Sequence, residues 1–270
     1  MAIHHQSFAL VFGLIGNIIS FLVFLAPVPT FYQIYKMKST EGFQSLPYVV
    51  ALFSCMLWIY YALTKKDSGP LLITINSFGC VIESIYIAIF LFYASKKLRL
   101  STIKLLLLLN VFGYGSMVIS TLYFAEGSKR VNIIGWISLV FNISVFAAPL
   151  FVMRRVIRTK SVEYMPFNLS MCLTLNAVMW FFYGLFLKDY YIALPNTLGF
   201  LFGIVQMVLF KMYRNSKPVK LEEPVKVQTQ SHHVIDVVKM TSNDNNNNDA
   251  ATEEDVEANK HNDRGCNGKV

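Results

Sequence analysis

Two stretches of this chain carry the same aromatic and polar residues in the same register. "SCMLWIYYALTKKD" begins at Ser54, and "NAVMWFFYGLFLKD" begins at Asn176, 122 residues later. Ser54 and Trp58 are four residues apart, as are Asn176 and Trp180, so on a helix each pair shares one face. An indole covers the apolar face of a ring-shaped ligand, whereas an amide bonds hydroxyls as both donor and acceptor. We interpret the two stretches as opposing walls of one uncharged binding site.

Paired asparagines extend this site. Asn76 and Asn196 occupy equivalent places in two later apolar runs. A side-chain amide facing lipid leaves its polar atoms unpaired, so a lone one is best explained by a hydrogen bond between helices, worth about 1 kcal/mol. Here the polar positions recur in pairs beside paired tryptophans, which favours a binding site between two repeats. Two further pairs share the same helical spacing: Ser20 with Val23, and Asn142 with Val145.

The composition indicates a membrane protein that must position these residues. The chain has 270 residues, of which 54% are hydrophobic and 15% charged. The formal net charge is +8, but the basic residues lie in short loops between apolar runs, so we expect no nucleic-acid partner. The four cysteines form neither a CxxC motif nor a cluster with histidine, so we predict no metal and no cofactor.

Seven segments are long and apolar enough to cross a bilayer, which predicts an all-α membrane fold. They are residues 8–28, 43–64, 70–94, 102–124, 131–153, 165–187 and 190–212. Fourteen basic residues flank one side of the spans and five the other. By the positive-inside rule, the N-terminus is expected to be extracellular and the C-terminus cytoplasmic.

An internal repeat organises the seven spans. "FLAP" at 24–27 matches "FAAP" at 146–149, and "KSTE" at 38–41 matches "KSVE" at 160–163, both with an offset of 122 residues. The fourth span has no counterpart, so the two repeats have the same orientation in the membrane. We therefore predict a 3+1+3 arrangement. Its parts are a first repeat at 8–94, a linker helix at 102–124, a second repeat at 131–213 and a disordered cytoplasmic tail at 214–270.

Prolines mark the cytoplasmic ends of the predicted spans. They form two pairs across the repeat: Pro27 with Pro149, and Pro47 with Pro166. Proline within a helix removes a backbone hydrogen bond and permits a kink. Because the prolines recur in symmetric pairs, we expect them to act as hinges that open one side of the protein.

The opposite ends of the spans carry Tyr61, Tyr183 and Asp189, with Lys65 nearby. One interpretation is an outer gate closed by hydrogen bonds and an ion pair. The other is an interfacial belt of aromatic residues with solvated loop charges. The residue pattern alone leaves both interpretations open.

Glu83 is a carboxylic acid inside a predicted span, seven residues after Asn76. It is either a hydrogen-bonded structural residue or a proton site, and the second interpretation makes a proton-coupled transporter an alternative function. A seven-helix receptor shares the predicted topology. However, the sequence has no DRY or NPxxY motif, and the internal repeat would have no role in a receptor.

Over about residues 8–213 the chain closely resembles the SWEET family of plant sugar transporters. The motifs that carry the resemblance are "FLAPVPTFYQIYKMKSTEGFQSLPY", "SCMLWIYYAL", "TINSFG", "VFAAP", "KSVEYMPF", "NAVMWFFYG" and "LPNTLG". The resemblance implies a non-enzymatic uniporter that moves sugar down its gradient in either direction by alternating access. It also implies association with further copies or other family members.

The resemblance also assigns roles residue by residue. It implies a substrate site formed by Ser20, Val23, Ser54, Trp58, Asn76, Asn142, Val145, Asn176, Trp180 and Asn196. It implies hinges at Pro27, Pro47, Pro149 and Pro166, and an outer gate of Tyr61, Tyr183 and Asp189. Val23 and Val145 leave more room than Leu or Met would, which favours a disaccharide. The sequence looks most like the sucrose-transporting clade III, which resides in the plasma membrane, so we predict sucrose, with glucose, fructose or a gibberellin-like hormone as additional substrates.

Overall fold

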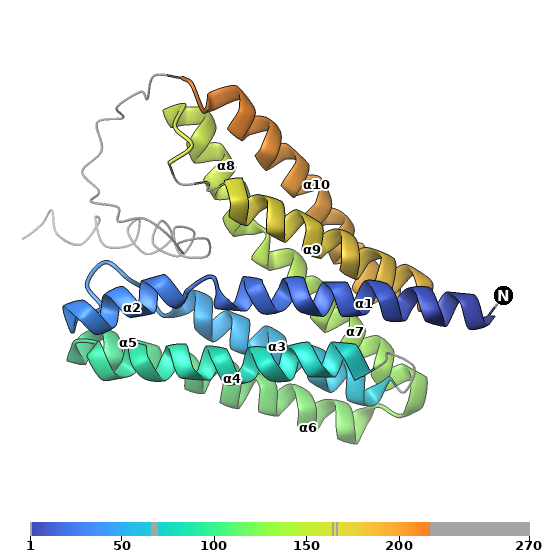
Figure 1. The fold of residues 1–270 in the computed structure, drawn as a ribbon. Helices are drawn as coiled ribbons and strands as arrows, with labels where there is room; N and C mark the ends of the chain where they lie inside the picture. The colour runs from blue at the N-terminus through green and yellow to red at the C-terminus, as the bar shows by residue number, and fades with distance from the viewer. Residues whose placement is uncertain (1, 66–69, 164, 166, 217–270) are drawn as a thin grey trace, which may run out of the picture.

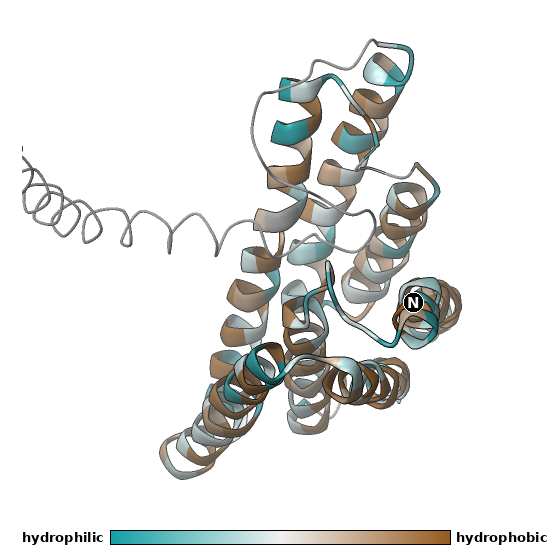
Figure 2. Cartoon of the chain, turned by 90° about the vertical axis from the view of Figure 1, so that its left-hand side faces the viewer, coloured by the Kyte–Doolittle hydropathy of each residue, from teal (hydrophilic) through white to brown (hydrophobic). Residues whose placement is uncertain are grey.

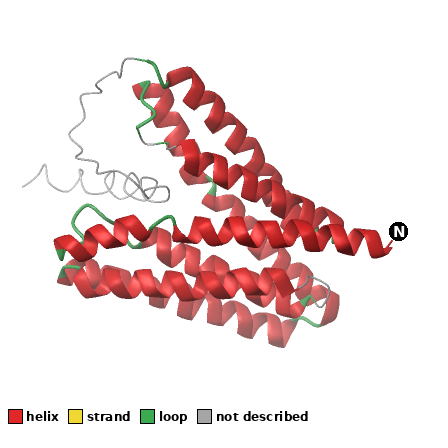
Figure 3. Ribbon diagram, viewed as in Figure 1, coloured by secondary structure: helices red, strands yellow, loops and turns green. Residues whose placement is uncertain are grey.

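The computed structural model describes residues 2–65, 70–163, 165 and 167–216, and all of their regular structure is helical (Figure 3). Seven helical stretches in these residues have the length and apolar composition needed to cross a membrane, as the sequence predicts. Three of these stretches combine several elements and four are single helices. In chain order they are α1 (Ala2–Leu25) with α2 (Val28–Met37), α3 (Leu46–Thr64), α4 (Pro70–Tyr93), α5 (Lys96–Leu106) with η1 (Leu107–Gly113) and α6 (Tyr114–Phe124), α7 (Gly127–Val145) with α8 (Ala147–Thr159), α9 (Phe167–Phe186) and α10 (Tyr190–Tyr213).

The first and fifth stretches are longer than the apolar runs predict. Helix α2 continues the first stretch to Met37, and α8 continues the fifth to Thr159, each after a break in the helix. Both extensions carry basic residues, so hydrophobicity ends before the helix does. The predicted tail starts at 214, and its residues 217–270 lie outside the described part of the chain.

The helices pack as two similar groups. In the first group α4 contacts α1, α2 and α3, and in the second α10 contacts α7, α8 and α9. Among the described residues the groups meet mainly through two helix pairs, α1 with α9 and α3 with α7, and each pair is the counterpart of the other under exchange of the repeats. The helices α5, η1 and α6 lie along the first group (Figure 1).

The backbone repeats along with the sequence. Lys38 and Lys160, which end α2 and α8, both adopt a left-handed conformation, with φ of 54° and 52°. A Cβ on Gly79 would lie 2.6 Å from Phe24 and from Cys55, and one on Gly199 would lie 3.3 Å from their counterparts Phe146 and Ala177. These glycines allow α4 and α10 to approach their neighbours closely at equivalent points.

Three buried clusters show how the two groups meet. One cluster draws on both groups and is called the shared core below. It consists of Ala9, Trp58, Tyr61, Ala62, Leu72, Ile75, Ile134, Trp180, Tyr183 and Ile192. A second cluster, around Phe31 and Tyr86, belongs to the first group alone, and a third, around Met153 and Val156, belongs to the second. The groups are therefore packed together near Asp189 and separate toward Lys38 and Lys160, where Figure 1 shows α8 and α10 diverging from α2.

The outer surface is apolar. Large side chains such as Ile18, Val81 and Phe92 are more than half exposed. Figure 2 shows apolar residues along the flanks of the helices, with hydrophilic residues gathered mainly toward their ends. Such a surface is a liability in water but the normal outer face of a helical bundle in lipid, and it identifies a multi-pass membrane protein.

Candidate substrate site and gate

The two tryptophans predicted as facing walls occupy equivalent environments. Both are buried in the shared core, Trp58 on α3 and Trp180 on α9. Trp58 meets the ring of Tyr61 edge-to-face, with centroids 5.7 Å apart, and Trp180 meets Tyr183 in the same way at 5.1 Å. Each tyrosine follows its tryptophan by three residues, so one helical turn fixes both rings.

The asparagine pair repeats in its hydrogen bonding. Nδ2 of Asn76 donates to the carbonyl of Leu72 at 2.8 Å, and Nδ2 of Asn196 donates to the carbonyl of Ile192 at 2.7 Å. Each bond reaches four residues back along the same helix and holds the amide in one orientation. Neither Oδ1 atom forms a hydrogen bond with a described residue. Two oriented amides, one in each group, therefore retain acceptor oxygens.

Ser20 links the two groups beside the second wall. Its Oγ donates to Oδ1 of Asn176 at 2.7 Å and accepts from Nε1 of Trp180 at 3.0 Å. The symmetry counterparts of Ser20 and Asn176 are Asn142 and Ser54, so each crossing carries one serine and one asparagine. Among the described residues, the side chains of Asn142 and Ser54 form no hydrogen bond.

Val23 and Val145 are both half-buried, one turn from Ser20 and Asn142 on α1 and α7. A valine offers only a short apolar surface, so neither position adds a polar group to the surroundings. The structure gives these two side chains matching positions in the two groups.

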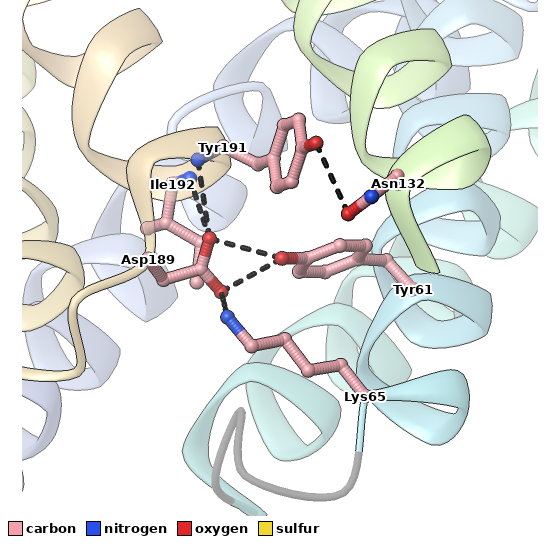
Figure 4. Close-up of polar contacts among 6 residues, drawn as sticks. All are labelled: Tyr61, Lys65, Asn132, Asp189, Tyr191 and Ile192. Atoms are coloured by element: carbon pink, nitrogen blue, oxygen red, sulfur yellow. Dashed lines mark hydrogen bonds and ion pairs between the residues drawn. The ribbon is translucent and has the colours of Figure 1, made fainter. Parts of the chain in front are cut away.

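Asp189 is the centre of a polar network at one end of the bundle (Figure 4). The Asp189 side chain is fully buried. The Tyr61 hydroxyl lies 2.9 and 2.8 Å from the two carboxylate oxygens, and Nζ of Lys65 lies 2.6 Å from Oδ2. Backbone N–H groups of Tyr191 and Ile192 donate to Oδ1 at 3.1 and 3.4 Å.

The Asp189 network joins α3 of the first group to the start of α10 in the second. It was predicted in part, because Tyr61, Lys65 and Asp189 were expected at this end. The Tyr191 ring was missed: it contacts Tyr61 edge-on at 5.9 Å and Trp136 at 5.9 Å. Tyr183 is buried at the same end, and a Cβ on Gly13 would meet its ring at 2.7 Å, so α1 and α9 are in close contact there.

The prolines occupy different helical positions. Pro27 lies at the break between α1 and α2, and Pro149 is the third residue of α8, just after the break at Phe146. Pro47 is the second residue of α3 and so kinks nothing, since an N–H in the first turn has no partner within its helix. Pro166 lies outside the described residues.

Glu83 is 4% exposed on α4, and its Oε2 has no hydrogen-bond partner. The ion pair found among the described residues joins Lys65 to Asp189, so Glu83 has no cationic partner in that part of the chain. Its counterpart is Gly203, where a Cβ would overlap the Thr174 side chain, so the second group has no room for a matching carboxylate.

Asn17 is a polar residue that sequence reasoning missed. Its Nδ2 donates to the carbonyl of Leu71 at 3.0 Å, and its Oδ1 accepts from Thr74 at 3.0 Å, which ties α1 to α4. Its repeat counterpart is the apolar Leu139, so Asn17 is not one of the paired polar positions from which the site was predicted.

Two similar helix groups, joined by an unpaired helix, enclose matched polar and aromatic residues. This arrangement defines a membrane transporter of the parallel-repeat class. A family model described as "Sugar efflux transporter for intercellular exchange" (MtN3) matches residues 10–98 and 132–218, segments that begin 122 residues apart. The chain belongs to this family, the SWEET family.

Curated relatives and a solved structure agree. The chain is 55% identical to the bidirectional sugar transporter SWEET10 of Arabidopsis thaliana over 243 residues, which cover 90% of this chain and 84% of the relative. It is 60% identical to bidirectional sugar transporter SWEET13 of Oryza sativa subsp. japonica over 216 residues, covering 80% and 72%. A 3.7 Å structure of a eukaryotic SWEET transporter aligns with a TM-score of 0.72 and 38% identity, covering 78% of this chain and 99% of that one. The predictions of a SWEET protein and of a non-enzyme are confirmed.

Proposed function

We propose that this protein is a bidirectional sugar uniporter that carries sucrose, and also hexoses, down a concentration gradient. The observation that carries the proposal is the amide pair. Asn76 and Asn196 hold equivalent geometry in the two groups, each with an acceptor oxygen that bonds no described residue, and each group also contributes one buried tryptophan to the shared core. Neutral amides and indole faces suit a polyhydroxylated ring, whereas an anion would call for basic residues. The ten residues inferred from the sequence form the proposed site.

Sucrose is the preferred substrate in this proposal because both Val23 and Val145 are short. The bidirectional sugar transporters that resemble this chain support a sugar in general, and the choice of disaccharide rests on the volume that the two valines leave. Radiolabelled sucrose and glucose uptake into cells that lack their own sugar transporters tests this. Uptake of neither sugar, with the protein present at the cell surface, would overturn the proposal.

Alternating access is the proposed mechanism. Two observations support it: the Asp189 network closes one end of the bundle, and the groups form separate cores toward the other end. In the cycle, the network opens while the separated ends approach each other, with bending at one or both of the helix breaks near Pro27 and Pro149. The moving units are the proposed repeats at 8–94 and 131–213, joined by the linker helix at 102–124.

We further propose that the protein lies in the plasma membrane with the Asp189 end outside and the C-terminus in the cytoplasm, and that it associates with copies of itself or other family members. The excess of basic residues on the Lys38 side supports this orientation. Accessibility of tags placed at either terminus of the chain in intact cells tests it.

A proton-coupled transporter is the second candidate, and the unpartnered carboxyl of Glu83 favours it. A buried carboxylate without a partner is costly in a span, so this group gains from binding a proton. Sucrose uptake into vesicles with and without a pH gradient separates the two candidates. Accumulation that depends on the gradient and is lost in Glu83→Gln would replace the uniporter proposal.

A further inference from the structure

The break between α1 and α2 is held by a side chain from another helix. Helix α1 ends at Leu25, and the last four carbonyls of a helix lack partners within it. Ala26 N donates to the carbonyl of Val23 at 3.1 Å, which tightens the turn. The carbonyl of Phe24 instead accepts the hydroxyl of Tyr86, from α4, at 3.0 Å. One phenol therefore satisfies a carbonyl at the break.

The same tyrosine ring also contacts the far side of the break. Tyr86 stacks on Phe31 of α2, with centroids 4.3 Å apart and planes only 9° from parallel. Tyr48 of α3 meets Phe31 edge-to-face at 4.8 Å. All three rings are buried. Tyr86 therefore hydrogen-bonds α1 through its hydroxyl and stacks on α2 through its ring face, and so fixes the angle between the two helices.

In the described residues of the second repeat, no side chain combines a hydrogen bond to one helix with ring stacking on the next. The carbonyl of Phe146, the counterpart of Phe24, accepts Leu150 N at 3.2 Å, a bond within its own chain segment. Gln206 stands at the position equivalent to Tyr86, and its buried side chain forms no hydrogen bond with a described residue. Met153 replaces Phe31. Among the described residues, no side chain from another helix hydrogen-bonds the break between α7 and α8, although the ring of Phe202 on α10 contacts Phe146 with centroids 5.3 Å apart.

We propose that Tyr86 is a positioning residue that latches the first hinge, so that bending during transport occurs mainly at the second hinge, at Phe146. This inference rests on the proposed function as a transporter. The two hinges are equivalent in the sequence repeat, but in the described residues a hydrogen-bonded tyrosine ring supports only the first of them. Helices α1 and α2 then move as one rod, while α8 changes its angle to α7.

Hydrogen exchange on the purified full-length chain, without sugar, tests the latch directly. Tyr86→Phe keeps the stack on Phe31 and removes only the hydroxyl. We expect amides between 24 and 31 to exchange about three- to tenfold faster, as loss of one hydrogen bond in a membrane interior allows, with 146–153 unchanged. Gln206→Leu is the matched control and should leave both segments unchanged. Unaltered exchange at 24–31, or an equal rise in both segments, would refute the latch.

Distances between spin labels test the movement. In a cysteine-free background, one pair of labels at Met37 and Phe92 reports on α2 against α4, and another at Ile157 and Met212 reports on α8 against α10; all four residues are exposed. On adding sucrose, the second distance should change and the first stay fixed, and Tyr86→Phe should free the first. A first distance that changes as much as the second in the native background overturns the inference. No response of either pair in any variant counts against the proposed sugar-driven cycle, while the exchange experiment still decides the role of Tyr86.

Discussion

Ser20 and Asn176 are hydrogen-bonded across the boundary between the two helix groups, at 2.7 Å, while their counterparts Asn142 and Ser54 are not bonded. A sugar hydroxyl that approaches Asn176 must compete with Ser20 for Oδ1. Asn176→Ser shortens the side chain and breaks this bond, which frees the Ser20 hydroxyl and enlarges the space beside it. We expect the ratio of sucrose to glucose flux to rise by about twofold or more. Paired uptake assays measure it, and an unchanged ratio would show that this bond does not influence selectivity.

Removing either amide of the Asn76 and Asn196 pair should strongly reduce transport. In Asn76→Ala or Asn196→Ala a sugar hydroxyl desolvated in the site loses its partner, at a cost of about 1–3 kcal/mol, or roughly 5- to 150-fold in flux. Sucrose uptake normalised to surface protein measures the effect. Asn110→Ala is the matched control, because Asn110 is a buried amide on the linker that bonds the carbonyl of Val49, away from the site. Near-normal flux in both site variants would disprove the amide pair.

Neutralising Asp189 should open the closed end. Asp189→Ala removes the acceptor that Tyr61 and Lys65 share, so the closed state should lose population and transport should fall by about tenfold or more. Reaction of a cysteine introduced at Ile192 with an impermeant thiol reagent reports the opening. Glu126→Gln, an exposed acid before α7, is the control. If Asp189→Ala labels no faster than the control, the network is not a gate.

Pocket volume can be tested with one methylene. Val145→Leu adds bulk to the proposed site without changing its polarity, and a disaccharide should lose more than a monosaccharide. A steric conflict of this kind is worth about 1–3 kcal/mol, so sucrose flux should fall roughly 5- to 150-fold relative to glucose flux. Competition between the two labelled sugars gives the ratio. Equal losses would mean that volume at this position is not the filter.

Gly184 should be intolerant of any side chain. A Cβ there would lie 2.8 Å from the Ala193 nitrogen and 3.0 Å from the Asp189 carbonyl oxygen, and both are backbone atoms. Gly184→Ala should therefore lower stability by roughly 1–3 kcal/mol, as overpacking does, with a lower melting temperature in detergent. Gly115→Ala, where a Cβ meets nothing within 4 Å, should not. Equal melting temperatures for the two variants would contradict the close approach of α9 and α10.

The sequence predicted what periodicity and repetition encode. Apolar runs located the seven spans, and the repeat located the equivalent residues, with an offset of 122 residues for Lys38 and Lys160 and of 120 for Asn76 and Asn196. The structure adds that both lysines have the left-handed conformation. The sequence could not predict where each helix ends, because α2 and α8 continue past their apolar segments. Nor could it predict bonds without repeat symmetry, such as that of Tyr86 to the Phe24 carbonyl, since a residue with no counterpart gives no signal in a search for pairs.

The candidate site was predicted as a set of residues, and its geometry was not. The repeat paired Ser20 with Asn142 and Ser54 with Asn176, but it did not show that Ser20 bonds Asn176. Pro47 illustrates the opposite limit: its type suggested a kink, whereas its place in the first turn of α3 makes it neutral to the helix. Residue type indicates what a side chain can do, and only the neighbouring elements decide whether it does so.

The shared core has an evolutionary consequence. Trp58 and Trp180 help to hold the two halves of the molecule together, so a change at either one would alter the proposed site and the packing of the two halves at once. Val23, Val145, Ser54 and Asn142 are only half-buried and stand outside that core. Substitutions at these four positions should lower the stability of the fold only slightly. New substrate preferences in descendants of this chain are therefore expected to arise there, with the tryptophans left in place.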